Sequence, residues 1–318
     1  MNRGGDEMTR RGFLAAAVAG TVPALGRGEP VAGRRRVLRL AHLTDVHVQP
    51  ERNAAAGFVA CLAHLQSQQD RPELILFGGD NIMDAFDQPR DRVRRQWELW
   101  HRILESDCSL PYEACIGNHD VWGWGRKAGV DPEEAGYGKA WAVEALRLGG
   151  RYRSFVRAGW KFLVLDSTHP AAEAPGYTAR LDEEQFDWLA GELKATPQTM
   201  PVLVLSHMPI LAACVFFDGH NEKSGNWQVP GAWMHIDARR LVALFHRHGN
   251  VKVCLSGHIH LVDAVHYLGT SYYCNGAVCG SWWKGPHQQF PEGYALVDLY
   301  DDGSATCHYV SYGWRAIG

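Results

Sequence analysis

The sequence lacks several patterns that would place it in common classes of protein. Its eight cysteines include no Cys-x-x-Cys pair, which argues against a cysteine-based zinc site. The net charge is −3, and no block of like charge occurs, so the basic field needed to bind a nucleic-acid polymer is missing. No internal repeat and no linker rich in serine, glycine and proline interrupts the interior. We therefore expect a single domain over residues 37–318.

The placement of the cysteines adds one further exclusion and one expectation. No cysteine precedes Cys61, so a lipid-modified N-terminal cysteine is not expected. Cys115 and Cys254 lie inside apolar runs, which indicates buried thiols. The cysteine count is compatible with an oxidising compartment. Pairing of Cys274 with Cys279 stays open, because sequence alone does not establish disulfide geometry.

The N-terminal segment has the pattern of an export signal. Arg10 and Arg11 precede an apolar stretch at 15–20. That stretch is too short and too rich in alanine and glycine for a transmembrane helix. Residues 1–26 are therefore predicted to be a twin-arginine signal peptide that engages the Tat translocation machinery, the alternative being a disordered basic tail. The predicted mature protein is periplasmic or extracellular and has no stable membrane anchor.

Short apolar runs alternate with segments of helical periodicity along much of the chain. Strands that each end in polar residues are predicted at 37–43, 74–77, 112–116, 202–205 and 252–255. Helices are predicted at 53–69, 88–105, 182–193 and 237–248, and short β-like runs fill the C-terminal part. This order predicts an α/β fold in which a mixed sheet packs on a second sheet and helices cover both outer faces.

All five of these strands run directly into side chains of the kinds that bind metals. These side chains are Asp45, His47, Asp80, Asn118, His119, His207, His258 and His260. Ligands of α/β sheets bind in the crevice outside the carboxyl ends of the strands. A single polar strand end is often an ordinary turn, but five such ends in one chain indicate a shared site.

Seven of these side chains, His119 excluded, can be divided between two metal ions if Asp80 bridges them. The division gives one ion Asp45, His47, Asp80 and His260, and the other Asp80, Asn118, His207 and His258. Mixed imidazole and oxygen ligands suit Mn, Fe, Zn or Co better than Ca or Mg. Because only two of the seven ligands are anionic, two such ions leave a net positive site. That charge predicts a bridging hydroxide as the nucleophile and an anionic substrate.

These strand ends resemble, in their order along the chain, five motifs of the calcineurin-like metallophosphoesterase superfamily. The matching residues are Asp45-x-His47, Gly79-Asp80, Gly117-Asn118-His119-Asp120, His207 and Gly257-His258-x-His260. The resemblance implies a four-layer α/β/β/α sandwich, with two mixed β-sheets flanked by helices, and a dinuclear metal site. It also implies that His119 assists the leaving group and that Asp120 orients His119.

The sequence differs from the motifs of two branches of this superfamily, which narrows the choice of branch. Met83 stands where purple acid phosphatases have a tyrosine ligand, and His47 is a first-motif histidine that they lack. Asp84 is followed by Ala85, whereas protein Ser/Thr phosphatases continue as Asp-Arg-Gly. What remains resembles the bacterial cyclic-nucleotide-phosphodiesterase-like branch.

The predicted function is hydrolysis of a small organic phosphate ester, with a phosphodiester as the leading hypothesis. A phosphomonoesterase or nucleotidase-like enzyme and a phospholipid-head-group hydrolase are the alternatives among enzymes. A metal- or anion-binding module without turnover is the alternative outside them. A complete ligand set together with His119 favours an enzyme.

Four residues in predicted loops are candidates for substrate contact. Trp282 and Trp283 could stack on an organic group of the substrate, and His220 and Asn221 follow the strand that ends at His207. Tryptophans in long loops equally form small cores beneath them. A surface histidine is usually only solvated. Both interpretations stay open at this point.

Overall fold

The computed structural model of the chain describes residues 33–125, 127 and 129–316. The predicted signal segment 1–26 lies outside these residues. Arg35–Gly318 forms one compact unit. Within the described part of the chain, no helix combines the length and the apolar character needed to span a membrane.

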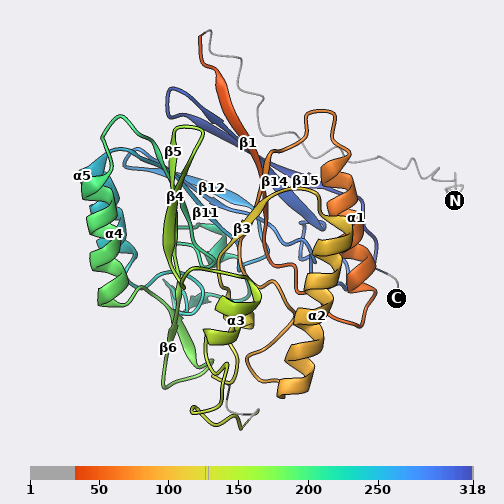
Figure 1. The fold of residues 1–318 in the computed structure, drawn as a ribbon. Coiled ribbons are helices and arrows are strands. Elements are labelled where there is room, and N and C mark those ends of the chain that lie inside the picture. The colour runs from red at the N-terminus through yellow and green to blue at the C-terminus, as the bar shows by residue number, and fades with distance from the viewer. Residues whose placement is uncertain (1–32, 126, 128, 317–318) are drawn as a thin grey trace, which may run out of the picture. The chain divides into compact units, whose positions relative to one another are not determined.

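Two mixed sheets form the centre of this unit (Figure 1). The first has the order β15 (Ala305–Ser311), β14 (Gly293–Tyr300), β1 (Arg36–Leu43), β2 (Leu74–Phe77) and β3 (Tyr112–Ala114). The second has the order β12 (Asp263–Tyr267), β13 (Thr270–Cys274), β11 (Val251–Ser256), β8 (Val202–Leu205), β5 (Trp160–Val164) and β4 (Arg153–Arg157). The C-terminal runs therefore join both sheets, because β12 and β13 extend the second sheet while β14 and β15 extend the first.

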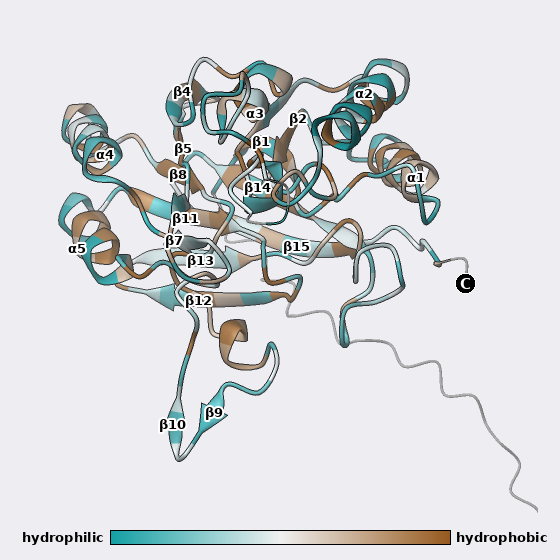
Figure 2. Cartoon of the chain, turned by 90° about the horizontal axis from the view of Figure 1, so that it is seen from below, coloured by the Kyte–Doolittle hydropathy of each residue, from teal (hydrophilic) through white to brown (hydrophobic). Residues whose placement is uncertain are grey.

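Helices cover the two outer faces of the sheets (Figures 1 and 2). On the first sheet lie α1 (Ala54–Gln66) and α2 (Arg90–Asp107), and on the second lie α4 (Glu183–Ala195) and α5 (Ala238–His248). Asp182 caps α4, since its Oδ1 accepts a hydrogen bond of 2.8 Å from the backbone N–H of Gln185. The predicted four-layer α/β/β/α sandwich is confirmed.

Three apolar cores hold these layers together, and they explain why the strands are apolar on both faces. Leu38 and Leu40 of β1 face the core between the sheets, whereas Ala41 and Leu43 pack under α1 and α2. β8 divides in the same way. Leu203 and Leu205 face the core between the sheets, whereas Val202 and Val204 face the core under α4 and α5. A strand buried on both faces has a nearly continuous apolar sequence.

Parallel pairing brings the polar strand ends together. β1, β2 and β3 run parallel to one another, as do β5, β8 and β11. Their carboxyl ends therefore meet at one edge of each sheet. The third strand ends at Ala114, two residues earlier than predicted, and Asn118–Asp120 form a single 3-10 turn, η1.

Shorter elements lie in the connections. These are α3 (Ala140–Ala145), β6 (Thr168–Pro170), β7 (Tyr177–Ala179), η2 (Cys214–Phe216), β9 (Glu222–Lys223) and β10 (Asn226–Trp227). The β9–β10 hairpin extends away from the sheets (Figure 2), and Trp227 on it is 56% exposed. All eight cysteines are free, and Cys274 lies beside Cys214 rather than bonded to Cys279. Cys115 and Cys254 are buried, as predicted.

Candidate metal centre

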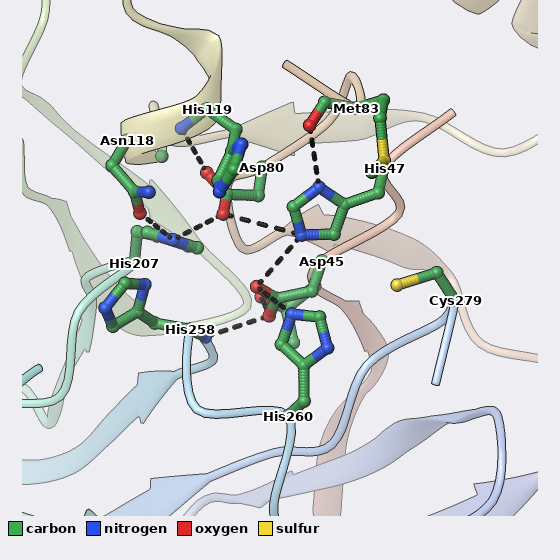
Figure 3. A network of polar contacts seen from close by, with 12 residues as sticks. Asp45, His47, Asp80, Met83, Asn118, His119, His207, His258, His260 and Cys279 are labelled. Atoms are coloured by element: carbon green, nitrogen blue, oxygen red, sulfur yellow. Dashed lines mark hydrogen bonds and ion pairs between the residues drawn. The ribbon is translucent and has the colours of Figure 1, made fainter. Parts of the chain in front are cut away.

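The seven predicted ligand side chains gather at the carboxyl ends of β1, β2, β8 and β11 and at η1 (Figure 3). Oδ1 of Asp45 lies 3.3 Å from Nε2 of His260. Oδ2 of Asp80 lies 3.6 Å from Nε2 of His47 and 3.2 Å from Nε2 of His207. Six of the seven side chains are buried and His258 is half-buried. Residues that lie far apart in the chain thus form one compact cluster.

The backbone of this cluster is strained at most of its polar side chains. Five of the seven residues have positive φ, namely Asp45 (55°), His47 (45°), Asp80 (51°), His258 (71°) and His260 (60°). Non-glycine residues adopt this left-handed conformation only when the surroundings impose it, and such residues concentrate at functional sites. These strained residues all follow the strand ends where the cluster forms.

Two motif glycines allow the strand ends to approach one another. A Cβ on Gly117 would lie 2.1 Å from Oδ1 of Asp80. A Cβ on Gly257 would lie 2.3 Å from Oδ2 of Asp45, which accepts a 2.9 Å hydrogen bond from the backbone N–H of His258. Any side chain at these positions would push the carboxylates out of the cluster, so glycine is required by close approach.

Each of the four histidines predicted to be ligands lies against a backbone carbonyl at one ring nitrogen. His47 Nδ1 lies 3.3 Å from Met83 O, and His207 Nδ1 lies 2.8 Å from Gly78 O. His260 Nδ1 lies 2.6 Å from Gly280 O, and His258 Nε2 lies 2.9 Å from Ala232 O. A carbonyl accepts a hydrogen bond, so that nitrogen carries a proton and the other ring nitrogen is the one available to a metal ion. Metal-binding histidines are oriented in this way.

The atoms that face the centre have the properties of a metal site. Oδ1 of Asp45 and Nε2 of His47 are buried and have no hydrogen-bond partner among the described residues. Asp45, His47 and Asp80 place one donor atom each within 4.8 Å of one another, and so do Asp80, His207 and His258. Asp80 belongs to both groups. The residues present therefore fit a pair of metal ions that share Asp80.

The electrostatics of the cluster also call for a cation. Burial lowers the pKa of His207, but the nearby carboxylate of Asp80 outweighs burial and raises the pKa to about 9. Burial lowers the pKa of His47 to about 3, which leaves a neutral imidazole. The buried carboxylates of Asp45 and Asp80 thus stabilise a nearby positive charge, which is either a proton on His207 or a bound metal ion. Protons and metal ions compete for such nitrogens.

His119 lies beside the cluster, with Asp84 as its partner. Its ring centroid is 4.9 Å from that of His47, and its Nδ1 lies 3.5 Å from Oδ1 of Asp84. Burial lowers the pKa of His119, but the carboxylates of Asp80 and Asp84 outweigh burial and raise the pKa above its usual value. His119 also lines the cleft above the cluster. The structure therefore places it where it can hold a proton near a bound substrate.

The expected role of Asp120 is wrong. Its carboxylate turns away from His119 and accepts hydrogen bonds from the backbone N–H groups of Gly117, Asn81 and Ile82, at 2.9, 2.9 and 3.2 Å. It also accepts one of 2.9 Å from Nδ2 of Asn81. Asp120 thus ties the end of β3 to the end of β2 and supports the site structurally.

A cleft of about 230 Å³ opens at the cluster. Its lining can be compared with the four residues predicted to contact the substrate. Trp282 lines the cleft. Trp283 is only 2% exposed and belongs to the core under α1, His220 is exposed away from the cleft, and Asn221 is buried with its amide donating to Val215 O and Asp218 O. Three of the four candidates are therefore not at the cleft.

Sequence reasoning missed several residues of the site. Asp84 is the one that the sequence could most easily have indicated, because it is a carboxylate four residues after Asp80. Tyr177 of β7 accepts a 3.2 Å hydrogen bond from Nδ2 of Asn118, which leaves Oδ1 of Asn118 facing His207 at 3.1 Å. Cys279 lies within 4.8 Å of ring nitrogens of His47 and His260 (Figure 3). Neither Tyr177 nor Cys279 belongs to any of the five motifs.

The fold and the paired carboxylate–histidine groups define a metal-dependent phosphoric ester hydrolase. The chain belongs to the calcineurin-like phosphoesterase family, whose model matches residues 38–262. This match confirms the superfamily predicted from the strand ends.

Individual relatives support the predicted branch. A 3′,5′-cyclic-nucleotide phosphodiesterase of Nostoc sp. is 25% identical over 288 residues, which cover 85% of this chain and 90% of the relative. The 3′,5′-cyclic adenosine monophosphate phosphodiesterase CpdA of Escherichia coli K12 is 23% identical over 299 residues, covering 87% and 90%. A dimetal phosphatase from Danio rerio shares the fold with a TM-score of 0.56 at 15% identity, covering 87% of this chain and all (100%) of that structure.

Proposed function

We propose that the protein hydrolyses a small phosphodiester, with a 3′,5′-cyclic nucleotide as the leading substrate class. The observation that carries the proposal is the charge of the cleft. None of the described residues that line it is Lys or Arg, and Asp218 adds a carboxylate. The metal centre is then the source of positive charge there. A diester carries one negative charge and a monoester up to two, so this cleft favours the diester. The names of the Nostoc and Escherichia coli relatives agree with this class.

The proposed ligand sets follow the two groups that share Asp80. One ion would be held by Asp45, His47, Asp80 and His260, and the other by Asp80, Asn118, His207 and His258. The nitrogen and oxygen donors suit Mn, Fe, Zn or Co. When bound, such a pair stabilises negative charge on the phosphoryl group and activates water for in-line attack.

Side chains of the protein protonate the leaving group and orient the proposed ligands. His119 donates a proton to the departing oxygen, and Asp84 holds the imidazole at Nδ1. Tyr177 orients Asn118 through the amide. The alternative substrates, a phosphomonoester, a nucleotide monophosphate or a phospholipid head group, would use the same residues.

A substrate panel tests the proposal. Purified protein is assayed with bis(p-nitrophenyl) phosphate, p-nitrophenyl phosphate, 3′,5′-cyclic AMP and glycerophosphoethanolamine, each with added Mn, Zn, Fe or Co. We expect kcat/KM to be higher for the aryl diester than for the aryl monoester, and we expect cyclic AMP to be hydrolysed. Faster hydrolysis of the monoester would overturn the assignment to diesters. Turnover of none of the four would favour a binding module.

We also propose that the protein is exported by the twin-arginine route. The support is Arg10-Arg11 ahead of a short apolar stretch. Replacing both residues by Lys should leave the precursor in the cytoplasm, because the translocation machinery distinguishes arginine from lysine at this pair. Fractionation followed by immunoblotting measures the distribution. Unchanged export of the double variant would rule this route out.

A further inference from the structure

Two adjacent tryptophans after β13 have an unusual backbone. Trp282 has a φ of 50° and Trp283 a φ of 66°. Bulky residues rarely adopt positive φ, and such strain persists only where neighbouring contacts impose it. The turn is closed by hydrogen bonds from Trp283 N–H to Cys279 O (2.8 Å) and from Ser281 N–H to Gly285 O (2.8 Å). The strained pair therefore has a fixed position.

Trp283 anchors the turn. Its indole Nε1 donates a 3.0 Å hydrogen bond to the carbonyl of His47, a proposed metal ligand. Its ring packs on α1 at Gly57, where an added Cβ would lie 2.2 Å from the indole. The ring also meets Trp314 edge-on with centroids 6.0 Å apart. Trp283 is thus held on several sides, and this arrangement decides where Trp282 points.

Trp282 is half-buried and stands at the rim of the metal centre. Its ring centroid lies 4.7 Å from that of His260 at an interplanar angle of 36°, and 6.1 Å from that of His47. The edge of His287 meets it at 5.8 Å. The indole is therefore fixed among three imidazoles and presents aromatic surface to the cleft that opens above the proposed ligands.

Part of the cleft lining suits an organic group. Trp233, Ile259 and Asp218 line the cleft together with Trp282 and the proposed metal ligands. Oδ1 of Asp218 lies 3.4 Å from Nε2 of His287 and accepts a 3.2 Å hydrogen bond from Nε2 of Gln288. This contact joins the loop after β8 to the loop after β13. A phosphate bound at the metal ligands would thus have aromatic and apolar side chains of the same cleft available to its ester substituent.

We infer that Trp282 is a stacking platform for a flat aromatic group, such as a nucleobase, on the phosphodiester, and that Trp283 is the positioning residue that presents it. This inference rests on the proposed function and names the substrate group that the cleft selects. Stacking needs only an aromatic face, so the platform should accept different bases. Its contribution is measured as the difference between an ester with a base and one without.

The test uses two substrates that differ only in the base. These are 3′,5′-cyclic AMP and 1-O-methylribose 3′,5′-cyclic phosphate, which has the same reacting diester. Trp282→Ala should lower kcat/KM for cyclic AMP by about 5- to 100-fold, mainly through KM, because stacking of one base on an aromatic side chain is of this size. The abasic ester should change less than about two-fold. Trp282→Phe should restore most of the loss.

Two further variants complete the test. Trp227→Ala is the matched control, since Trp227 is exposed on the β9–β10 hairpin outside the cleft, and it should change neither substrate. Trp283→Phe removes the hydrogen bond to His47 O, and it should lower the ratio of cyclic AMP to abasic hydrolysis as Trp282→Ala does. A fall in both substrates together, with an unchanged ratio, would assign Trp283 a purely structural role.

The outcomes separate this inference from the proposed function. Equal losses on both substrates in Trp282→Ala, or no loss on either, would overturn the stacking role while leaving diester hydrolysis in place. If the wild-type protein hydrolyses neither ester, the proposed function fails. Calorimetric titration with AMP and with ribose 5-phosphate then still tests the platform. AMP should bind more tightly to wild type than to Trp282→Ala, and equal affinities would overturn the inference.

Discussion

Replacing Asp80 by alanine should release both metal ions and abolish hydrolysis. One carboxylate oxygen of Asp80 lies near both His47 and His207, so the same side chain serves both proposed sites. Removing a single preorganised electrostatic group from a reacting centre already lowers kcat by about 10²–10³. Loss of both metal ions should therefore lower kcat/KM by more than about 10³. Elemental analysis and hydrolysis of bis(p-nitrophenyl) phosphate measure the two effects.

Asp218→Asn is the matched control for this experiment. Asp218 also lines the cleft, but it belongs to neither proposed ligand set. This variant should retain about two ions per chain. Circular dichroism must show that Asp80→Ala is folded, because Asp80 also accepts a 2.8 Å hydrogen bond from the backbone N–H of His119. Two ions in a folded Asp80→Ala protein would contradict the bridging role.

Replacing His119 by alanine should slow hydrolysis in a way that depends on the leaving group. In the proposed mechanism His119, which lines the cleft, donates a proton to the departing oxygen, and general acid catalysis of this kind is worth about 10²–10⁴ in rate. A nucleoside alkoxide needs that proton when it departs, whereas a nitrophenolate is stable as an anion. The loss in kcat/KM should thus be far larger for cyclic AMP than for bis(p-nitrophenyl) phosphate. Both esters are assayed with metal content measured in parallel.

Asp84 and Asp120, the two acidic residues that could partner His119 by sequence, provide the controls. Asp84→Asn should reproduce the leaving-group dependence in weaker form, because Asp84 faces Nδ1 of His119. Asp120→Asn should lower the free energy of unfolding by about 1–3 kcal/mol, because an amide cannot accept all the hydrogen bonds that the carboxylate accepts from Gly117, Asn81 and Ile82. Equal loss on both esters in His119→Ala would show that His119 stabilises phosphoryl charge instead. Loss of a metal would make it a ligand.

The sequence by itself determined the layers of the fold and the location of the site. Runs such as 202–205 are apolar at every position, and in so short a segment this pattern favours a strand buried on both faces. Polar residues directly after such strands must lie at the sheet edge, because parallel strands share one direction. For that reason the positions of Asp45, Asp80 and His207 followed from local sequence alone.

Only the tertiary structure decided which side chains face one another. Asp120 and Asp84 are equally plausible partners of His119 in the sequence, but η1 turns Asp120 toward the β2 loop and leaves His119 facing Asp84. Trp282 and Trp283 are neighbours, yet one lines the cleft and the other is buried in the core. The direction of a side chain on a strained turn depends on backbone dihedrals that distant contacts impose, such as the bond from Trp283 to His47. Local sequence carries no record of those contacts.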